Sequence, residues 1–266
     1  IYTSTSGDKN QSHQPWKDLG YGIFTGSLTK ELLKNSFDCI VHSYKDLPVL
    51  KSKTDFVTIK RADPRDVLLI KKTSIKKNKL ILATSSPRRK SSTKELKKLL
   101  NKKNISSKMI RGNVTTRLDK VLNSKDYDGI FMAKAAIDRI YTYGNKVNKS
   151  ETKKFINYFK KFTPIILPLS LFPTAASQGA IAIEFKTNDK KTQSLLNKIN
   201  CKETLKICLE ERKLLKKYGG GCGLDIGITI ENVKNNYFLF SKGIDAKSKK
   251  HFHQNKLLNK NKLKKT

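Results

Sequence analysis

Acidic residues are scarce in this chain, and this scarcity sets its electrostatics. Only 22 of the 266 residues are Asp or Glu, against 56 Lys or Arg, so the formal net charge is +34 at pH 7. A positive field of this size attracts polyanions, meaning nucleic acid, an anionic membrane surface or a small polycarboxylate. Aromatic residues make up only 8% of the chain, whereas a nucleic-acid groove interleaves aromatic with basic side chains. We therefore expect no nucleic-acid partner, and a basic nucleic-acid-binding protein is kept as an alternative.

Cysteine is also rare. The four cysteines show no C-x-x-C spacing and have no histidine at ligand spacing, so we expect no metal site. Nothing in their positions indicates a disulfide framework, and a reducing compartment fits best. They are Cys39, Cys201, Cys208 and Cys222.

Long apolar runs are missing too. The longest candidate, 165–176, is interrupted by Pro168 and Pro173 and is too short to cross a bilayer, so we expect no membrane span. The chain starts with Ile1 rather than Met, which indicates a processed form or a fragment. No targeting peptide can be read from it.

Arginine is the rare member of the basic set. Only eight of the 56 basic residues are Arg, and four of these are Arg88, Arg89, Arg111 and Arg117, in two short segments. Guanidinium groups bind carboxylate or phosphate bidentately, whereas scattered lysines mostly keep a surface soluble. The Lys/Asn-rich stretches, including 256–265, are interpreted as solvated surface and tail rather than as a nucleic-acid arm.

The apolar pattern predicts alternating strands and helices. A chain of 266 residues holds about two domains, or three if one is small. The alternation indicates an α/β fold with a parallel sheet covered by helices on both faces. The predicted strands are 39–41, 67–70, 80–83, 106–110 and 127–132, and the predicted helices are 28–37, 87–100 and one that begins after Asn113.

Polar motifs follow several of these strands, at the end of the sheet where ligands bind in open α/β folds. The segment 43–46 follows the first strand and is closed by Pro48. Asp46 beside Lys45 is either a catalytic carboxylate kept ionised by its neighbour or part of a solvated turn.

Two further segments combine turns with arginines. Ser85-Ser86-Pro87-Arg88-Arg89 offers hydroxyls, helix-start amides and two guanidiniums to an anion. A capped helix explains Ser86 and Pro87 but makes no use of the paired arginines. The segment 111–117 places a glycine turn between two arginines, and the alternative is a turn with two unrelated charges.

Gly220-Gly221-Cys222 follows a helical segment and precedes the apolar run 226–230. Neighbours without bulk leave a thiol within reach of another molecule. Glycines after a helix also serve as caps, and in that case the thiol is incidental.

In this order the motifs resemble those of the porphobilinogen deaminase family, also called hydroxymethylbilane synthases. Five ordered segments with compatible spacing cover the chain from near its start to about residue 230, with further matches at 22–24 and 63–66. The five are His42–Pro48, Thr84–Arg89, Ile110–Val114 with Arg117-Leu118, Ser177–Ala180 and Gly220–Cys222.

The resemblance implies a transferase of tetrapyrrole and heme biosynthesis. Such an enzyme joins four porphobilinogen molecules head to tail with loss of ammonia, and hydrolysis then frees hydroxymethylbilane. Cys222 would hold a dipyrromethane cofactor through a thioether, and this cofactor primes the chain. Each pyrrole carries an acetate and a propionate, so the growing chain is a polyanion that paired arginines suit.

By the same resemblance Asp46 is the catalytic carboxylate. It would assist loss of the protonated amine, stabilise the azafulvene cation and take part in removing the proton from the attacked pyrrole. The residues implied to bind the cofactor are Cys222, Lys45, Ser43, Ser85, Ser86, Arg88, Arg89, Arg111 and Gly112. Those implied to bind the substrate are Arg111, Arg117, Arg88, Phe24 and Gln178.

The family architecture implies two periplasmic-binding-protein-like α/β domains around a cleft and a smaller C-terminal α/β domain that carries the cysteine. By analogy, domain 1 is 1–62 with 179–198 returning to it, domain 2 is 67–174, and domain 3 is 201–266. The resemblance also implies a monomer whose partners are porphobilinogen and the growing polypyrrole chain.

The chain also departs from the family pattern. The family's opening strand and helix, with an Arg-x-Ser motif, have no counterpart, because 1–8 already resembles the second strand. Tyr21 replaces a lysine, and 141–169 resembles a lysine-rich insertion. An inactive truncated homologue and a solute-binding module of the same fold are alternatives, and the latter would need neither Asp46 nor Cys222. The Lys, Asn and Ile enrichment resembles proteins of AT-rich protozoan genomes, so we expect a cytoplasmic or plastid location.

Overall fold

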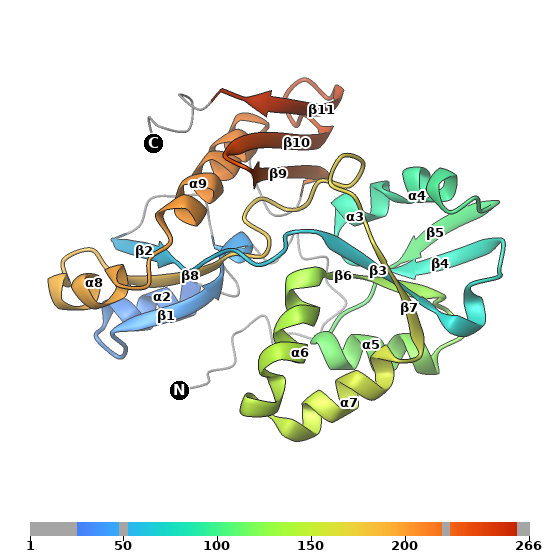
Figure 1. Ribbon diagram of the computed structural model, residues 1–266, viewed down its shortest axis with the longest axis horizontal. Helices are drawn as coiled ribbons and strands as arrows, with labels where there is room; N and C mark the ends of the chain where they lie inside the picture. Colours follow the sequence, from blue (N-terminus) through green and yellow to red (C-terminus); the bar gives the residue numbers. More distant parts are fainter. Residues whose placement is uncertain (1–25, 48–52, 220–223, 260–266) are drawn as a thin grey trace. The chain divides into compact units, whose positions relative to one another are not determined.

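The computed structural model describes residues 26–47, 53–219 and 224–259 (Figure 1). The chain divides into two compact units: unit 1 is 1–64 with 175–266, and unit 2 is 65–174. Three sheets are described, two of them in unit 1 and one in unit 2.

Unit 2 is built on a five-stranded mixed sheet in the order β5-β4-β6-β3-β7. β4 pairs in parallel with β5 and β6, whereas β3 pairs antiparallel with β6 and β7. The strands are β3 (Asp66–Lys71), β4 (Lys79–Ala83), β5 (Asn104–Lys108), β6 (Gly129–Ala133) and β7 (Phe162–Ile166). The helices are α3 (Pro87–Ser91), α4 (Thr93–Leu99), α5 (Val114–Asn123), α6 (Lys134–Val147) and α7 (Lys149–Phe159), and η3 (Lys72–Ser74) is a 3₁₀ turn.

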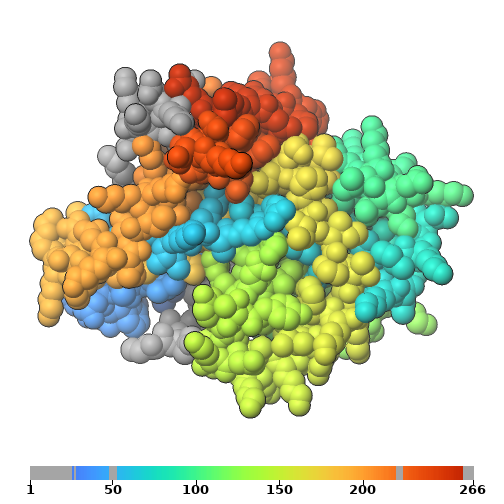
Figure 2. All heavy atoms as spheres, in the orientation of Figure 1, coloured from blue at the N-terminus to red at the C-terminus, as the bar shows by residue number. Residues whose placement is uncertain are grey.

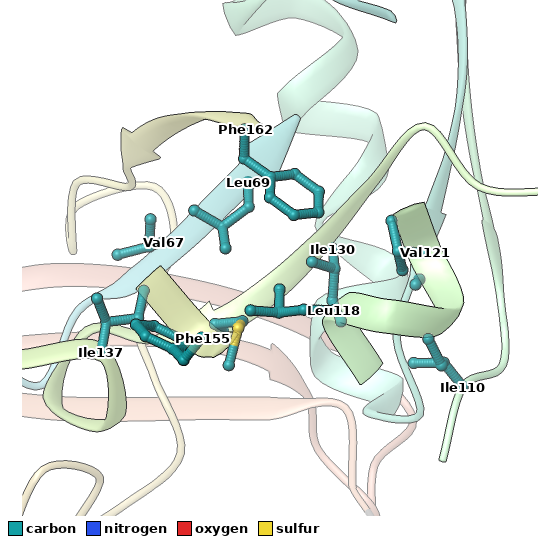
Figure 3. Close-up of a cluster of buried hydrophobic side chains, with 11 residues drawn as sticks. Val67, Leu69, Ile110, Leu118, Val121, Ile130, Ile137, Phe155 and Phe162 are labelled. Carbon is teal, nitrogen blue, oxygen red and sulfur yellow. The ribbon is translucent and has the colours of Figure 1, made fainter. Parts of the chain in front are cut away.

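Both faces of this sheet are buried. Along β3, alternation places Val67 and Leu69 on one face and Leu68 and Ile70 on the other, and all four side chains are at most 3% exposed. Figure 3 shows the first core, in which side chains of α5, α6 and α7 pack against β3 and β6. The second core lies between the sheet and α4. Helices on both faces explain why 67–70 is a continuous apolar run.

The first sheet of unit 1 is antiparallel, in the order β1-β8-β2. β8 comes late in the chain and pairs with both early strands. In β1, Ile40 and His42 are buried while the alternate residues are exposed, so Ser43 at the end of the strand reaches solvent. The elements are α2 (Gly26–Leu33), β1 (Cys39–Ser43), η2 (Tyr44–Asp46), β2 (Thr54–Thr58), β8 (Ile181–Lys186) and α8 (Lys190–Asn197).

The second sheet of unit 1 is an antiparallel meander, β9-β10-β11, that packs on α9. Ile207 and Leu215 of α9 share a core with Ile226, Ile228 and Ile230 of β9. α9 also contacts β2 of the first sheet, and in Figure 2 the orange atoms of α8 lie beside the blue atoms of the α2–β1 segment. The bounds are α9 (Lys202–Lys217), β9 (Ile226–Val233), β10 (Asn236–Ile244) and β11 (His251–Leu258).

The prediction of a parallel sheet is wrong for β3 and β7 in unit 2 and for every strand pair of the β1-β8-β2 sheet. A parallel pair needs a crossover, usually a helix, between its strands. β3 instead passes to β4 through the short segment 72–78, which holds the 3₁₀ turn η3 and no crossover helix, so β3 runs opposite to β4 and to its neighbour β6.

The other predicted elements exist with shifted ends. The strands predicted at 106–110 and 127–132 run at 104–108 and 129–133, and the helix predicted at 28–37 runs at 26–33. The helix predicted at 87–100 is two helices that meet at Ser92, whose Oγ donates to the Arg88 carbonyl at 2.9 Å. Serine hydroxyls compete in this way for backbone partners, which explains the break.

Candidate active site

The turn after β1 carries Asp46. Tyr44–Asp46 form one turn of 3₁₀ helix, closed by Leu47 N donating to Tyr44 O at 3.3 Å. Tyr44 is fully buried and its N–H donates to Ala180 O at 3.1 Å, whereas Ser43 and Asp46 are exposed. The buried tyrosine therefore anchors the backbone while the carboxylate of Asp46 faces solvent.

Lys45 joins this turn to the segment 175–180. Its Nζ donates to Gln178 Oε1 at 3.5 Å, and Gln178 Nε2 donates to Pro64 O at 2.7 Å. Gln178 is 1% exposed. Gly179 follows with φ +87°, where an added Cβ would lie 2.5 Å from Ala62 O, so only glycine fits. The structure thus brings together Lys45 and Gln178, two of the predicted site residues.

A buried ion pair holds the Gln178 segment. Arg61 Nη1 and Nη2 lie 2.7 and 3.2 Å from Glu211 Oε1 and Oε2, and Arg61 Nε donates to Gln178 O at 2.9 Å. Glu211 also accepts from Ser177 N at 2.6 Å and from Ile230 N at 2.7 Å. Burial alone would lower the pKa of Arg61, but the Glu211 carboxylate raises it above its ordinary value. The ionised pair ties this segment to α9 and β9.

A second buried carboxylate, that of Glu184, lies on β8 beside β1 in the same sheet. His42 Nε2 is 2.9 Å from Glu184 Oε2, and Thr29 Oγ1 donates to the same oxygen at 3.0 Å. Thr54 Oγ1 donates to Glu184 Oε1 at 2.5 Å. Burial would raise the pKa of Glu184, but these hydrogen bonds and His42 bring it below its usual value. The strand that leads to Asp46 is therefore fastened by an ionised carboxylate.

In unit 2 the paired arginines lie around one carboxylate. Arg88 Nη1 and Arg89 Nε lie 2.9 and 3.2 Å from Asp66 Oδ2, and Arg89 Nη2 lies 2.7 Å from Oδ1. Arg88 also donates to Pro173 O at 3.2 Å, and Arg89 to Phe131 O at 3.4 Å. Both arginines are buried, at 7 and 9% exposure. Two guanidiniums against one carboxylate leave this cluster with a net positive charge.

Helix α3 starts beside these arginines. Ser86 is its N-cap, with Oγ accepting from Arg89 N at 3.5 Å, and Pro87 occupies the first turn. The predicted cap and proline position are confirmed. Ser85 Oγ donates to Ile110 O, so its hydroxyl joins the end of β4 to the segment after β5.

The second arginine segment wraps the start of α5. Gly112 has φ +123°, and an added Cβ would lie 2.9 Å from Thr116 Cγ2. Asn113 caps α5, with Oδ1 accepting from Thr116 N at 2.8 Å. Arg117 Nε donates to Asn113 O at 3.3 Å. Arg111 and Arg117, both half-buried, thus lie on either side of one glycine turn.

Arg117 lies close enough to Arg89 for their charges to interact. Burial, and then the like charge of Arg89, lower the pKa of Arg117. Over the ranges that the structure covers, Arg117 has no ion-pair partner, while Arg88 and Arg89 share Asp66. Three guanidiniums against one carboxylate suit a ligand with several carboxylates.

Two predicted site residues lie outside the described residues. They are Phe24 and Cys222, together with Gly220, Gly221 and Pro48 of the same motifs. The roles predicted for them stay predictions.

Sequence reasoning missed the residues that support the site. These are Asp66, Arg61, Glu211, Arg212 and Glu184, all of which are buried or nearly so. One signal was present in the sequence. In a chain with so few acids, a glutamate inside the apolar segment 181–185 indicates a buried, partnered charge, because a charge is rarely buried alone.

The described ranges contain no group of three or more His, Cys, Asp or Glu side chains that could hold a metal ion. In the same ranges, no helix combines the length and the apolar character needed to span a membrane.

Comparison with known proteins links this chain to one family. Residues 1–194 match the family model described as "Porphobilinogen deaminase, dipyromethane cofactor binding domain". A "Probable porphobilinogen deaminase" of Picrophilus torridus is 37% identical over 239 residues, covering 89% of this chain and 75% of that protein. Proteins of the same name from Saccharolobus islandicus and Sulfurisphaera tokodaii are each 32% identical over 241 residues, covering 90 and 89% of this chain and 74 and 73% of their own lengths.

Proposed function

We propose a residue-level mechanism from the premise that this chain belongs to the porphobilinogen deaminase family. The chain is a transferase of tetrapyrrole and heme biosynthesis, acts on porphobilinogen and uses a dipyrromethane cofactor. In the reaction each porphobilinogen loses its amino group as ammonia and is joined head to tail to the growing chain.

The observation that supports our assignment most is the charge around Arg117. Porphobilinogen carries an acetate and a propionate, so every added unit brings two carboxylates. Arg117 has no ion-pair partner among the described residues, and its pKa is lowered by burial and by Arg89. A carboxylate placed there would relieve this repulsion, and we propose that Arg117, with Arg111, binds the substrate's carboxylates.

The same donor set fits the dipyrromethane group, which carries carboxylates of the same kind. The residues that would hold it are Ser43, Lys45, Ser85, Ser86, Arg88, Arg89, Arg111 and Gly112, with Cys222 as the thioether partner. When bound, the group supplies the pyrrole position to which the first substrate is joined. Asp66 already fixes the guanidinium groups of Arg88 and Arg89, so these groups would bind a cofactor carboxylate without changing their orientation.

Asp46 is proposed as the catalytic carboxylate. Breaking the C–N bond of the protonated aminomethyl group releases ammonia and leaves positive charge on the substrate. An exposed carboxylate on an anchored turn stabilises that charge as it develops. After the new C–C bond forms, the attacked ring carbon gives up a proton, which the same carboxylate can accept. Phe24 and Gln178 are proposed to line the substrate site.

We also propose the domain division expected from the sequence. The β1-β8-β2 sheet belongs to domain 1, the mixed sheet of unit 2 to domain 2, and α9 with the meander to domain 3. Domains 1 and 2 are proposed to have folds of the periplasmic-binding-protein type, and the enzyme is proposed to act as a monomer. The pairing of β8 with β1 and β2 supports a segment that returns to domain 1.

The first test is the intact mass of the purified protein beside its Cys222→Ala variant. We expect a covalent two-pyrrole adduct on the parent protein and none on the variant. An adduct that persists on Cys222→Ala would contradict the assigned attachment residue, while its absence from both would contradict cofactor assembly in this chain.

The second test compares Asp46→Asn with Asp55→Asn, a matched control at an exposed position of β2 in the same unit. We expect kcat for porphobilinogen consumption to fall about 100-fold or more in Asp46→Asn, because a charge that stabilises the transition state is lost. KM should change little and Asp55→Asn should behave as the parent. Equal kcat values in the two variants would remove Asp46 from the mechanism.

A further inference from the structure

Arg212, a buried arginine of α9, binds the backbone of the turn that carries Asp46. Arg212 Nη1 donates to Tyr44 O at 3.2 Å, and Nη2 donates to Leu47 O at 2.9 Å. Its Cζ also lies 4.9 Å from the centroid of the Tyr44 ring. Arg212 is 7% exposed. The guanidinium therefore binds the two carbonyls that flank Lys45 and Asp46.

This contact needs the shape of arginine. The planar guanidinium offers two parallel donors in a fixed geometry and stacks on an aromatic ring, whereas a lysine ammonium is a single point charge on a flexible stem. Both carbonyls and the ring belong to one short turn, so all three contacts restrain the same backbone segment.

α9 anchors both sides of the Lys45–Gln178 contact. Glu211 accepts from the backbone N–H of Ser177 and pairs with Arg61, while its neighbour Arg212 holds the Tyr44–Leu47 turn. Adjacent residues of one helix thus fix the two backbone segments that carry Lys45 and Gln178. The same helix ends at Lys217, five residues before Cys222.

We propose that Arg212 is a positioning residue for catalysis, which sets the place of the Asp46 carboxylate by clamping the carbonyls of Tyr44 and Leu47. This inference rests on the proposed role of Asp46 toward the substrate. Without the clamp the turn keeps its sequence and charge but loses its fixed position, and small misplacements of catalytic groups lower rates strongly.

The test measures porphobilinogen consumption by Arg212→Lys and Arg212→Met. We expect kcat to fall about 10-fold in Arg212→Lys and about 100-fold in Arg212→Met, because misplacement by about 1 Å costs that much. KM should stay within about threefold of the parent value, because the described contacts of Arg212 restrain the Tyr44–Leu47 turn that carries the catalytic carboxylate. Lys213→Met is the matched control, since the Lys213 side chain is 69% exposed and it is the next residue of the helix.

A second readout does not depend on activity. Amide hydrogen exchange of the 43–47 peptide should be slow in the parent protein and in Lys213→Met, and faster in both Arg212 variants. A purely structural role for Arg212 would lower the unfolding temperature and leave kcat per folded molecule unchanged. Folded Arg212 variants with kcat within about twofold of the parent would therefore overturn the proposal.

Wild-type protein provides the remaining check if the variants do not fold. Side-chain NMR should show the guanidinium protons of Arg212 exchanging slowly, as expected of buried hydrogen-bonded donors, and rapid exchange would overturn the clamp. If the parent protein consumes no porphobilinogen, the proposed function fails, and the exchange measurements still decide whether Arg212 holds the turn.

Discussion

The turn that carries Asp46 also contains a buried hydroxyl, that of Tyr44. Tyr44 is 0% exposed, and its Oη has no hydrogen-bond partner among the described residues. Burial raises the pKa of Tyr44 far above its ordinary value, so the group is a neutral phenol. A buried polar group without a partner carries a desolvation penalty.

Tyr44→Phe is therefore expected to stabilise the protein by about 1 kcal/mol, since it removes the hydroxyl and keeps the ring that packs on Phe56 and Arg212. Urea unfolding of both proteins measures this free energy. Tyr143→Phe, at a position 58% exposed, is the control and should leave it unchanged. A loss of stability in Tyr44→Phe would mean that the hydroxyl has a partner.

Single residues with a local signature were predictable from the sequence. Ser86 and Pro87 at the start of α3 follow from short-range capping rules, and both are confirmed. The surroundings of Arg88 and Arg89 were not predictable, because Asp66 lies more than 20 positions earlier in the chain and only the pairing of β3 brings it near. The roles predicted for these arginines toward carboxylates stay predictions.

At the scale of elements, two helices begin with the same kind of cap. Asn113 caps α5 and Asn148 caps α7, each through a side chain that accepts from the backbone N–H three residues later. Of these two helices, α5 carries a proposed substrate-binding arginine, Arg117, whose Nε donates to Asn113 O, whereas α7 contains no arginine. Removing each cap in turn therefore distinguishes an effect on the stability of the protein from an effect on substrate binding.

Asn113→Ala and Asn148→Ala should each lower the free energy of unfolding by about 1 kcal/mol. KM for porphobilinogen should rise in Asn113→Ala, because the first turn of α5 frays and Arg117 loses its place, and it should not change in Asn148→Ala. Urea unfolding and steady-state kinetics of both variants measure this. A similar rise of KM in both variants would show that general destabilisation, and not Arg117, controls binding.

Element type was predictable from apolar spacing, whereas strand direction was not. The run 67–70 is recognisable as a strand because it is continuously apolar and short. Its antiparallel pairing with β6 and β7 follows from the short connection 72–78 to β4, which holds no crossover helix and carries no periodic signal. The position of β8 between β1 and β2 could come only from the resemblance, since local spacing does not say which distant strand returns.

At the scale of the whole molecule, each unit contains a buried carboxylate whose pKa is lowered. In unit 1 burial would raise the pKa of Glu184, but its hydrogen bonds hold it below 4.5. In unit 2 burial would raise the pKa of Asp128, but Lys77, Ile81 N and Ser74 hold it below 3.8. A lowered pKa in the folded state gives stability that is complete above the unfolded pKa and is lost as pH falls through the folded pKa.

The free energy of unfolding should therefore decline below about pH 4.5, with each carboxylate contributing at most about 1.4 kcal/mol per pH unit. Urea unfolding between pH 7 and pH 3 measures the decline. Glu184→Gln and Asp128→Asn should each be less stable at pH 7 and show a shallower acid slope. An unchanged slope in Glu184→Gln would mean that its carboxylate has the same pKa folded and unfolded.

The net charge of +34 has opposite effects on folding and on substrate binding. Like charges repel in the compact state, so screening should stabilise the fold, whereas the attraction of an anionic substrate should weaken. Between about 0.05 and 0.5 M NaCl the Debye length falls from about 14 to about 4 Å. We expect Tm to rise and KM for porphobilinogen to rise over this range.

Two variants separate the local from the global part of this effect. Arg117→Met should reduce the salt dependence of KM, because one binding charge is gone, and should leave the rise of Tm intact. Lys97→Met removes an exposed charge of α4 and should alter neither slope. If KM kept the same salt slope in Arg117→Met as in Lys97→Met, the substrate would be drawn by the overall field of the protein, and Arg117 would not be a carboxylate ligand.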